Sequence, residues 1–482
     1  MVGILALGAY VPRLRLQRAA VARSVSWFNP ALAALGKGER ALCAWDEDTI
    51  TMAVEAARDC MAGGDRAAIG KVLLASTTFP YADRQNAGVV KEALTLDDDT
   101  GTLDVTGSQR AGTSALIVAL DAAGNAPVLC VASENAIAKP ASEAEFVNGD
   151  AAAAVLVGTG DTLADFLGSH SVSIDFVDHF RASDRRYAVA WESRWVRDEG
   201  YAKIMPAAIG AALAKFGIDP AAVDHFVMPS PVRGIAQAMA RAAGIAPPAV
   251  CDPLQDVIGD AGCAQPLLLL ADTIEKARPG EIILVVSFGQ GCDILAFRAT
   301  ERVTQARQAL GVQGWLKRRA VEDNYVKYLY WTGEITLDGG LRSELDLKMP
   351  LSLLYRERKT LLGLVGGRCR ETGTVQFPKT RISVAQNARM VDTQDDYPLA
   401  ELPARVVTFT ADHLAASDAP PACYGMVEFD GGGRFVADFA DVDAEGMAVG
   451  APVRMMFRLK RKDERGFKHY FWKAVPDYRP AA

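Results

Sequence analysis

Three side chains, an aspartate, a histidine and a tyrosine, are candidates for proton transfer. Asp260 lies in the segment Gly259–Gly262, and a partly buried carboxylate there could have its pKa raised toward neutrality, as a general base needs. His179 follows Asp178, which could orient its ring, and Tyr201 could donate a proton. Each has a structural alternative that stays open: Asp260 as a helix cap, His179 as a satisfied structural histidine, and Tyr201 as a packing residue.

The backbone offers a second kind of chemistry through glycine-rich turns. A helix expected to start near Gly112, and the loop Ser287–Gly291 with Gly289 and Gly291, can aim N–H groups at an oxygen that develops negative charge. Thr77, just after a short apolar strand, is a further candidate for the same group. Such preorganised donors stabilise an enolate-like oxyanion without the help of a nucleophile.

Composition narrows the class of protein that can carry this chemistry. The chain has 482 residues, of which 50% are hydrophobic and 23% charged, and its formal net charge is −7. The negative charge argues against a nucleic-acid partner, and no apolar run is long enough to span a bilayer. The N-terminal segment lacks a basic region and a cleavage site, so we expect a first strand there. The eight cysteines show no pairing pattern, which favours a reducing cytoplasm.

Residues 1–300 read as alternating strands and helices with an internal repeat. The small-residue helix Gly112–Ala123 leads to the strand Pro127–Ser133, and the helix Cys263–Ala277 leads in the same way to the strand Glu281–Ser287. The strands are short, continuous apolar runs, as expected for central strands covered on both faces. This order predicts an α/β fold built from two duplicated units.

We place the first half of this fold at residues 1–160 and the second at 161–300. Small residues at the start of both helices would let them approach closely and pack on each other at the centre. The alternative is that they are Ala-rich surface helices.

The remaining residues have a different pattern. Residues 301–345 read as a helical linker with the aromatic cluster Tyr325–Trp331, which we expect to dock on another part of the protein. Residues 346–482 contain short β-like segments, and the turn Asp430–Gly433 separates two of them as in a hairpin. Several short strands in this space predict a small β-barrel.

Several motifs carry a family resemblance. The segments Asp46–Ala53, Asp104–Leu116 and Ile283–Gly291 together resemble the 3-hydroxy-3-methylglutaryl-CoA synthase branch of the thiolase superfamily, and Trp195–Tyr201 is similar to bacterial and archaeal members. The resemblance covers roughly residues 1–300. It implies a duplicated, five-layer αβαβα domain that acts on CoA thioesters, most often as a dimer.

The C-terminal residues resemble the OB-fold acyl-CoA-associated proteins that accompany thiolase-like enzymes, through Gly367–Cys369 and Gly373–Pro378. These relatives often hold zinc with two Cys-x-x-Cys pairs. Here Cys369 is present, but one cysteine cannot form a tetrahedral site, so we predict a degenerate zinc ribbon without metal. The other three ligand positions are occupied by Thr372, Ser383 and Gln386.

The catalytic residues that the resemblance implies are all replaced. The synthases use a Glu/Cys/His set, in which the cysteine thiolate takes the acetyl group and the other two handle protons. In this chain the Glu position reads Thr77, the Cys position reads Gln109 and the His position reads Pro229. An Asn position before the second central helix reads Asp260. Gln109 could hydrogen-bond a thioester carbonyl or a substrate hydroxyl, or it could be filler.

These observations favour an enzyme that acts on a 3-hydroxyacyl- or β-ketoacyl-CoA by aldol or retro-aldol chemistry without an acyl-enzyme. One alternative is a synthase-type acyltransferase with a displaced nucleophile, most plausibly Cys263 or Cys292. Another is a non-catalytic acyl-CoA-binding scaffold for a thiolase. We expect no cofactor other than coenzyme A as part of the substrate, a homodimer, and a thiolase as a possible partner chain.

Overall fold

The chain folds into two compact units. The computed structural model describes residues 1–305, 309–340, 348–385, 390–443 and 446–477. The first unit comprises Met1–Ala44, Asp48–Gly88 and Asp97–Tyr328, and the second comprises Trp45–Glu47, Val89–Leu96 and Leu329–Ala482. Within the described ranges, no helix is both long and apolar enough to cross a bilayer.

A nine-stranded mixed sheet forms the first unit. Its order is β11-β12-β13-β8-β1-β7-β6-β4-β5. These strands are β11 (His225–Val227), β12 (Ile282–Phe288), β13 (Gly291–Ala299), β8 (Ala164–Ser173), β1 (Val2–Tyr10), β7 (Ala151–Thr159), β6 (Val128–Glu134), β4 (Lys71–Ala75) and β5 (Gly101–Val105). The sheet divides into two halves at β1 and β8, which pair over only two positions, Gly3 with Asp165 and Ile4 with Ala164.

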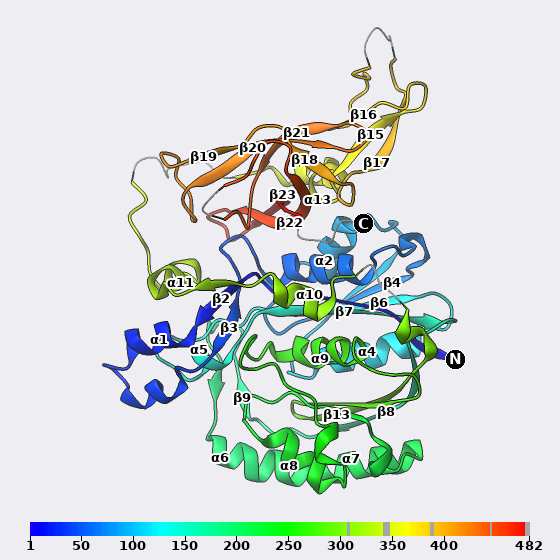
Figure 1. Ribbon diagram of the computed structural model, residues 1–482, viewed down its shortest axis with the longest axis vertical. Coiled ribbons are helices and arrows are strands. Elements are labelled where there is room, and N and C mark those ends of the chain that lie inside the picture. Colours follow the sequence, from blue (N-terminus) through cyan, green and yellow to red (C-terminus); the bar gives the residue numbers. More distant parts are fainter. Residues whose placement is uncertain (306–308, 341–347, 386–389, 444–445, 478–482) are drawn as a thin grey trace. The chain divides into compact units, whose positions relative to one another are not determined.

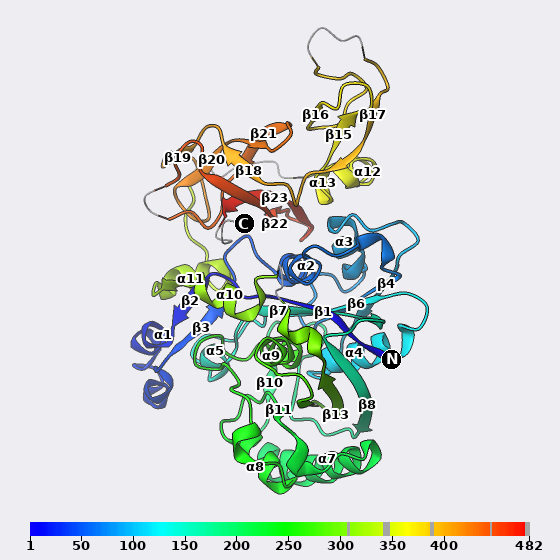
Figure 2. The ribbon, with the colours of Figure 1, turned by 45° about the vertical axis from the view of Figure 1, so that its right-hand side comes forward.

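The two halves of this sheet and three helical layers give the expected αβαβα arrangement (Figures 1 and 2). One outer layer covers β1 and β7, the central layer lies between the two halves, and the other outer layer covers β8 and β13. The outer helices are α2 (Thr49–Cys60) and α10 (Gly311–Lys317) on one side, and α7 (Ala202–Phe216) and α8 (Ile235–Ala242) on the other; the central ones are α4 (Ala111–Ala122) and α9 (Gln265–Ile274). The predicted α/β fold class is confirmed.

The two central helices are the core of the unit. Every residue of α9 is buried. At the start of α4, a Cβ on Gly112 would lie 2.1 Å from the carbonyl oxygen of Cys263, so the backbones touch where only glycine fits. The prediction that the two segments pack on each other is therefore confirmed, and the surface-helix alternative is wrong.

The remaining elements of the first unit surround this core. They are α1 (Arg18–Val25), α5 (Ala144–Val147), α6 (Ser193–Trp195), β2 (Leu14–Gln17), β3 (Glu39–Leu42), β9 (His179–Phe180), β10 (Val189–Ala190) and β14 (Ala320–Glu322), while α3 (Asn86–Ala93) and α11 (Tyr325–Trp331) each continue into the second unit.

The segment expected to be a docking linker is largely part of the first unit. Asp59 accepts hydrogen bonds from the N–H groups of Leu310 (2.7 Å) and Gly311 (3.0 Å), which fix the start of α10. Further on, β14 pairs in parallel with β2. The first unit continues to Tyr328. The domain boundaries at 301 and 345 stay predictions, and residue 345 lies outside the described residues.

The second unit is built from antiparallel strands. A six-stranded sheet contains β18 (Ala404–Val406), β19 (Thr410–Asp412), β20 (Ala422–Phe429), β21 (Arg434–Asp438), β22 (Pro452–Lys462) and β23 (Lys468–Pro476). A three-stranded sheet contains β15 (Val365–Cys369), β16 (Val375–Gln376) and β17 (Gln394–Pro398), and two helices precede it, α12 (Leu351–Arg356) and α13 (Arg358–Leu362). The turn predicted at Asp430–Gly433 connects β20 and β21, which pair as a hairpin.

Candidate functional site

The site forms where two parallel strands of the first unit end together. β4 and β6 are neighbours in register, with Ala75 opposite Ala132. Two residues further along each strand, Thr77 and Glu134 come side by side. The Thr77 hydroxyl donates to one carboxylate oxygen of Glu134 at 2.9 Å, and the Thr77 N–H donates to the other at 3.2 Å. Sequence reasoning missed Glu134, which is 1% exposed.

Gln109 occupies the turn before α4 and faces His179 of β9. The Gln109 amide nitrogen lies 3.2 Å from His179 Nε2, and His179 Nδ1 lies 3.1 Å from Asp178 Oδ1. The expected pairing of a carboxylate with His179 is thus observed, and the orienting role of Asp178 stays a prediction. The hydrogen bond to Asp178 raises the pKa of His179 above its ordinary value against the opposing effect of burial, and Asp260 and Glu134 add to the rise.

Asp260 lies next to this contact. Its Oδ1 accepts the N–H of Gly262 at 2.9 Å. Burial raises the pKa of Asp260 to about 6; the Gly262 N–H opposes this shift, Glu134 adds to it and His179 reduces it. This hydrogen bond fixes the turn Asp260–Gly262, but the cap of the short helix Gly262–Ala264 is Ala261, which makes no side-chain cap hydrogen bond. The capping interpretation of Asp260 is therefore not borne out, and its raised pKa suits a base.

Gln109 and Glu134 both pack against Gly262. A Cβ on Gly262, which has a φ of +50°, would lie 2.7 Å from Gln109 Oε1 and 3.3 Å from Glu134 Oε2. Among the described residues, Gln109 Oε1 is buried without a hydrogen-bond partner. A buried acceptor of this kind costs free energy unless a donor reaches it. The amide oxygen therefore lacks, within the described residues, the hydrogen bond that would offset its burial.

Tyr201 is close to the same charges but packed. It is 4% exposed, and its ring lies 4.5 Å from that of Phe288. Burial raises the pKa of Tyr201 well above its ordinary value, a hydrogen bond with Ser230 opposes the shift, and Asp178 and Asp260 add to it. The phenol therefore stays neutral at physiological pH. Its packing role is observed, and proton donation remains a prediction.

At two of the four proposed oxyanion positions the N–H group has a partner within the protein, and all four assignments stay predictions. The Gly289 N–H donates to the carbonyl oxygen of Gly291 at 2.9 Å, and the Thr77 N–H donates to Glu134. Neither N–H is free for a thioester oxygen in this structure. Gly291 has a φ of +107°, and a Cβ there would lie 1.9 Å from the carbonyl oxygen of Val172, so this glycine permits close pairing of β13 with β8. The N–H groups of Gly291 and Gly112 stay predictions as donors.

A charged network outside these predictions holds the turn that carries Gln109. The Arg110 guanidinium donates to the carbonyl oxygen of Gly289 (3.0 Å) and to Asp293 Oδ1 (2.8 Å). Asp293, 1% exposed, also accepts hydrogen bonds from three hydroxyl groups. These belong to Thr113 (3.0 Å), Ser114 (2.7 Å) and Ser171 (2.7 Å). Asp293 therefore ties the start of α4 to β8 and β13.

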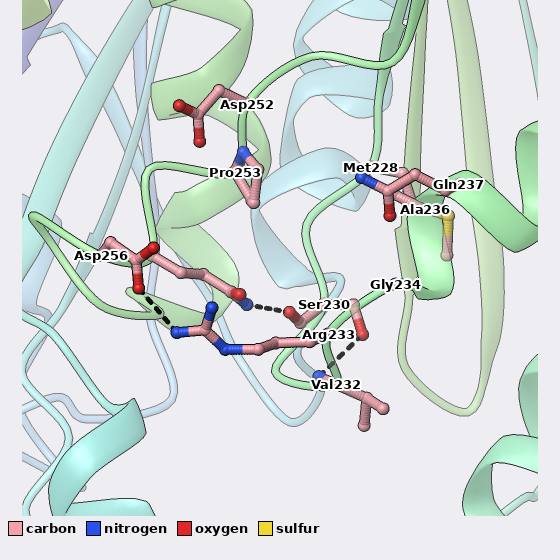
Figure 3. A pocket seen from close by; sticks show the side chains of 11 residues that line it. Met228, Ser230, Val232, Arg233, Gly234, Ala236, Gln237, Asp252, Pro253 and Asp256 are labelled. Carbon is pink, nitrogen blue, oxygen red and sulfur yellow. Dashed lines mark hydrogen bonds and ion pairs between the residues drawn. The ribbon is translucent and has the colours of Figure 1, made fainter. Parts of the chain in front are cut away.

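A cavity of about 240 Å³ opens beside the segment after β11, next to Pro229. Figure 3 shows Arg233 extending across it to Asp256, with an N···O distance of 2.6 Å. Ser230, the partner of Tyr201, also lines it. We refer to Glu134, Asp178, His179 and Asp260 as the acid–base group. The cavity is linked to this group through Ser230 and Tyr201. It is too small for more than part of a large ligand.

The cysteines that could act as displaced nucleophiles are buried. Burial, followed by the Glu134 carboxylate, raises the pKa of Cys263 well above its ordinary value, and burial raises the pKa of Cys292 to about 12. A nucleophilic cysteine needs the opposite environment, one that lowers its thiol pKa. Both positions thus disfavour a thiolate at neutral pH.

The region of the predicted degenerate zinc ribbon lies in the second unit. Cys369 Sγ lies 3.2 Å from Thr393 Oγ1, and the described residues contain no cluster of three or more metal-binding side chains. Gln386 lies outside the described residues. The absence of zinc stays a prediction.

Comparisons with known proteins match both units. The family described as 3-oxoacyl-[acyl-carrier-protein] synthase III C terminal matches residues 213–298, and the family described as ChsH2, C-terminal OB-fold domain matches residues 398–458. The hydroxymethylglutaryl-CoA synthase of Aeropyrum pernix is 29% identical over 348 residues, which cover 70% of this chain and 95% of the relative. That of Archaeoglobus fulgidus is 28% identical over 340 residues, 68% of this chain and 98% of the relative.

Solved structures give the same fold. MvaS in complex with 3-hydroxy-3-methylglutaryl coenzyme A superposes with a TM-score of 0.59 at 21% identity and covers 69% of this chain and 91% of that one. The HMG synthase of the curacin biosynthetic pathway gives a TM-score of 0.59 at 20% identity, covering 70% and 92%. At these identities the likeness establishes the fold of the first unit.

Proposed function

Because this chain is a 3-hydroxy-3-methylglutaryl-CoA synthase-like member of the thiolase superfamily fused to an OB-fold domain, we propose that it makes or breaks a carbon–carbon bond in a CoA thioester. The reaction is aldol or retro-aldol chemistry on a 3-hydroxyacyl- or β-ketoacyl-CoA, without a cysteine acyl-enzyme. Coenzyme A enters only as part of the substrate.

One observation carries this proposal. At the position where a nucleophilic cysteine would stand, the Gln109 amide lies 3.2 Å from His179, beside the buried Glu134 and an Asp260 with a raised pKa. These groups can transfer protons and donate hydrogen bonds, but they cannot hold an acyl group as a thioester.

Retro-aldol cleavage needs only such groups. A base takes the proton of the 3-hydroxyl, the C2–C3 bond breaks, and a carbonyl product leaves. The electron pair moves onto the thioester oxygen as an enolate, which is then protonated at C2. Asp260 is the proposed base for the hydroxyl, because a carboxyl of pKa about 6 is mostly ionised at neutral pH. The reverse sequence is the aldol addition.

The test is mass spectrometry of the CoA pool after the purified protein is incubated with a panel of 3-hydroxyacyl-CoAs, and separately with acetyl-CoA plus acetoacetyl-CoA. A shortened CoA thioester together with a released aldehyde or ketone supports the proposal. 3-Hydroxy-3-methylglutaryl-CoA from the second incubation would instead indicate a condensing acyltransferase. A pool that stays unchanged with every substrate would favour an acyl-CoA-binding scaffold.

No acyl adduct is expected on the protein. Intact-protein mass spectrometry after incubation with acetyl-CoA should show the unmodified mass, because Cys263 and Cys292 are buried thiols with raised pKa values. Peptide mapping then locates any adduct that does appear. An acetyl group on either cysteine would support the displaced-nucleophile alternative and contradict the proposal.

The cavity beside Ser230 is the proposed binding place for part of the CoA moiety. The positively charged residue that lines this cavity is Arg233, whose side chain is 70% exposed and paired with Asp256. Arg233→Ala should raise KM for acyl-CoA about 5–10-fold with little change in kcat, because a charge-assisted contact with a phosphate contributes roughly 1–2 kcal/mol.

The matched control for this prediction is Arg434→Ala in the second unit, an exposed arginine paired with Glu428 at 2.7 Å. It should leave KM unchanged. If both variants gave the same KM, the cavity would have no role in CoA binding.

We further propose that the chain acts as a homodimer and that a thiolase is a possible partner; light scattering of the protein alone and with a thiolase tests both.

A further inference from the structure

Glu134 is a carboxylate of the site that no sequence pattern assigned, and its surroundings hold it in place. It lies at the end of β6, 1% exposed, with both oxygens bonded to Thr77 (2.9 and 3.2 Å). A buried carboxylate costs several kcal/mol unless its lone pairs are satisfied. A threonine that gives both its hydroxyl and its N–H to one carboxylate fixes the orientation of that group.

The same carboxylate packs against Gly262, beside Gln109. Its Cγ and Oε2 lie 3.1 and 3.3 Å from the point where a Cβ on Gly262 would stand, and the unpartnered Gln109 Oε1 lies 2.7 Å from that point. Glu134 is also among the charges that act on Asp260 and His179. It therefore belongs to the same acid–base group as Asp260 and His179.

The proposed reaction moves two protons, one at the 3-hydroxyl oxygen and one at C2 of the acyl chain. Besides Asp178, which pairs with His179, the group contains the carboxylates Glu134 and Asp260. We propose that Glu134 is the catalytic residue that exchanges the proton at C2, while Asp260 serves the hydroxyl. This inference rests on the proposed function and deepens it, because it assigns enolate formation to a named residue. Thr77, at the position where relatives place a glutamate, becomes the positioning residue for Glu134.

The step itself balances without a further reactant. Glu134 takes a proton from C2, the C–H electron pair forms the C1–C2 double bond, and the thioester π pair moves onto the oxygen. In the reverse direction Glu134 returns a proton to C2. With no carbon electrophile present, repeated removal and return in D₂O exchanges the C2 hydrogens of an acyl-CoA for deuterium.

The experiment is therefore deuterium incorporation into acetyl-CoA in D₂O, followed by mass spectrometry. The wild-type protein should catalyse the exchange, Glu134→Gln should lower its rate by about 10²-fold or more, and Glu134→Asp should retain part of it. Thr77→Val should lower it less than Glu134→Gln, because the backbone N–H of residue 77 still holds the carboxylate. The matched control is Glu145→Gln, a fully buried carboxylate that accepts a hydrogen bond from Tyr325; it should leave exchange within about threefold.

A double substitution that swaps the side chains of Thr77 and Glu134 gives a second, independent test. Glu134→Thr alone should be as slow as Glu134→Gln. The double variant Thr77→Glu/Glu134→Thr places the carboxylate on β4 in the same register and should recover at least about tenfold over Glu134→Thr. Thermal unfolding and acyl-CoA binding of each variant show whether a loss is chemical.

The outcomes separate this inference from the proposed function. Three results would overturn the assignment to Glu134. The first is a C2 exchange rate of Glu134→Gln within threefold of the wild-type rate, and the second is an equally large loss of that rate in Glu145→Gln. The third is cleavage of a substrate by wild-type protein without exchange of its C2 hydrogens. If exchange depended on Glu134 but no substrate gave carbon–carbon products, the assignment would stand and the proposed aldol reaction would fail.

Discussion

Replacing Asp260 by asparagine is expected to lower kcat by about 10²–10⁴-fold, the range that general acid–base catalysis contributes. Asparagine keeps the size of the side chain, and its amide oxygen can still accept the Gly262 N–H that Asp260 accepts at 2.9 Å. The fold should therefore survive while the base is lost. Acyl-CoA binding, measured by calorimetry, should change little.

The dependence of kcat on pH tests the role of Asp260 further. A base acts when it is deprotonated, and the pKa of Asp260 is raised to about 6. The wild-type kcat should therefore fall as the pH is lowered through about 6, and this limb should be absent in Asp260→Asn. The matched control is Asp161→Asn, whose carboxylate is 83% exposed and pairs with Arg302. A variant at Asp260 that kept both the rate and the limb would show that its carboxylate serves only the turn.

The acid–base group was only partly predictable from sequence. Asp178 and His179 are adjacent in the chain, so the contact between them could be inferred from local sequence. Glu134 could not be inferred in this way. It meets Thr77 only because β4 and β6 are parallel neighbours in a particular register, and register between strands that are 57 residues apart in sequence is a tertiary property.

The role of a glycine was also only partly predictable from sequence. Their positions suggested N–H donors for an oxyanion, yet the structure gives Gly112 and Gly291 a steric reason, since a Cβ at either would lie within 2.1 Å of a carbonyl oxygen. Sequence alone cannot distinguish a glycine required for close approach from one required for its N–H group. In contrast, the hairpin at Asp430–Gly433 was predictable, because turn residues between two apolar runs specify it locally.

Asp293→Ala is expected to lower the free energy of unfolding by about 3–5 kcal/mol, the usual cost of removing one partner of a buried ion pair. Asp293 accepts hydrogen bonds from Arg110 and three hydroxyl groups. Without it, the guanidinium, only 17% exposed, and those hydroxyls lose their acceptor. Urea unfolding of purified protein measures the change. The control is Asp224→Ala, an exposed carboxylate that accepts the N–H of Ile282 at 2.8 Å and should cost about 1 kcal/mol.

Asp293 also helps to position the turn that carries Gln109, so the loss of its carboxylate should lower activity. Arg110 joins Asp293 to the loop carbonyl of Gly289, and Gln109 precedes Arg110 directly. Asp293→Asn, which keeps the shape, should fold and yet lower kcat about tenfold or more with KM little changed, because a displacement of about 1 Å in a reacting group can cost 10²-fold. A variant that lost stability but kept kcat would show that the turn of Gln109 is held by α4 alone. A variant that lost both would place the Arg110–Asp293 pair among the features that position the site.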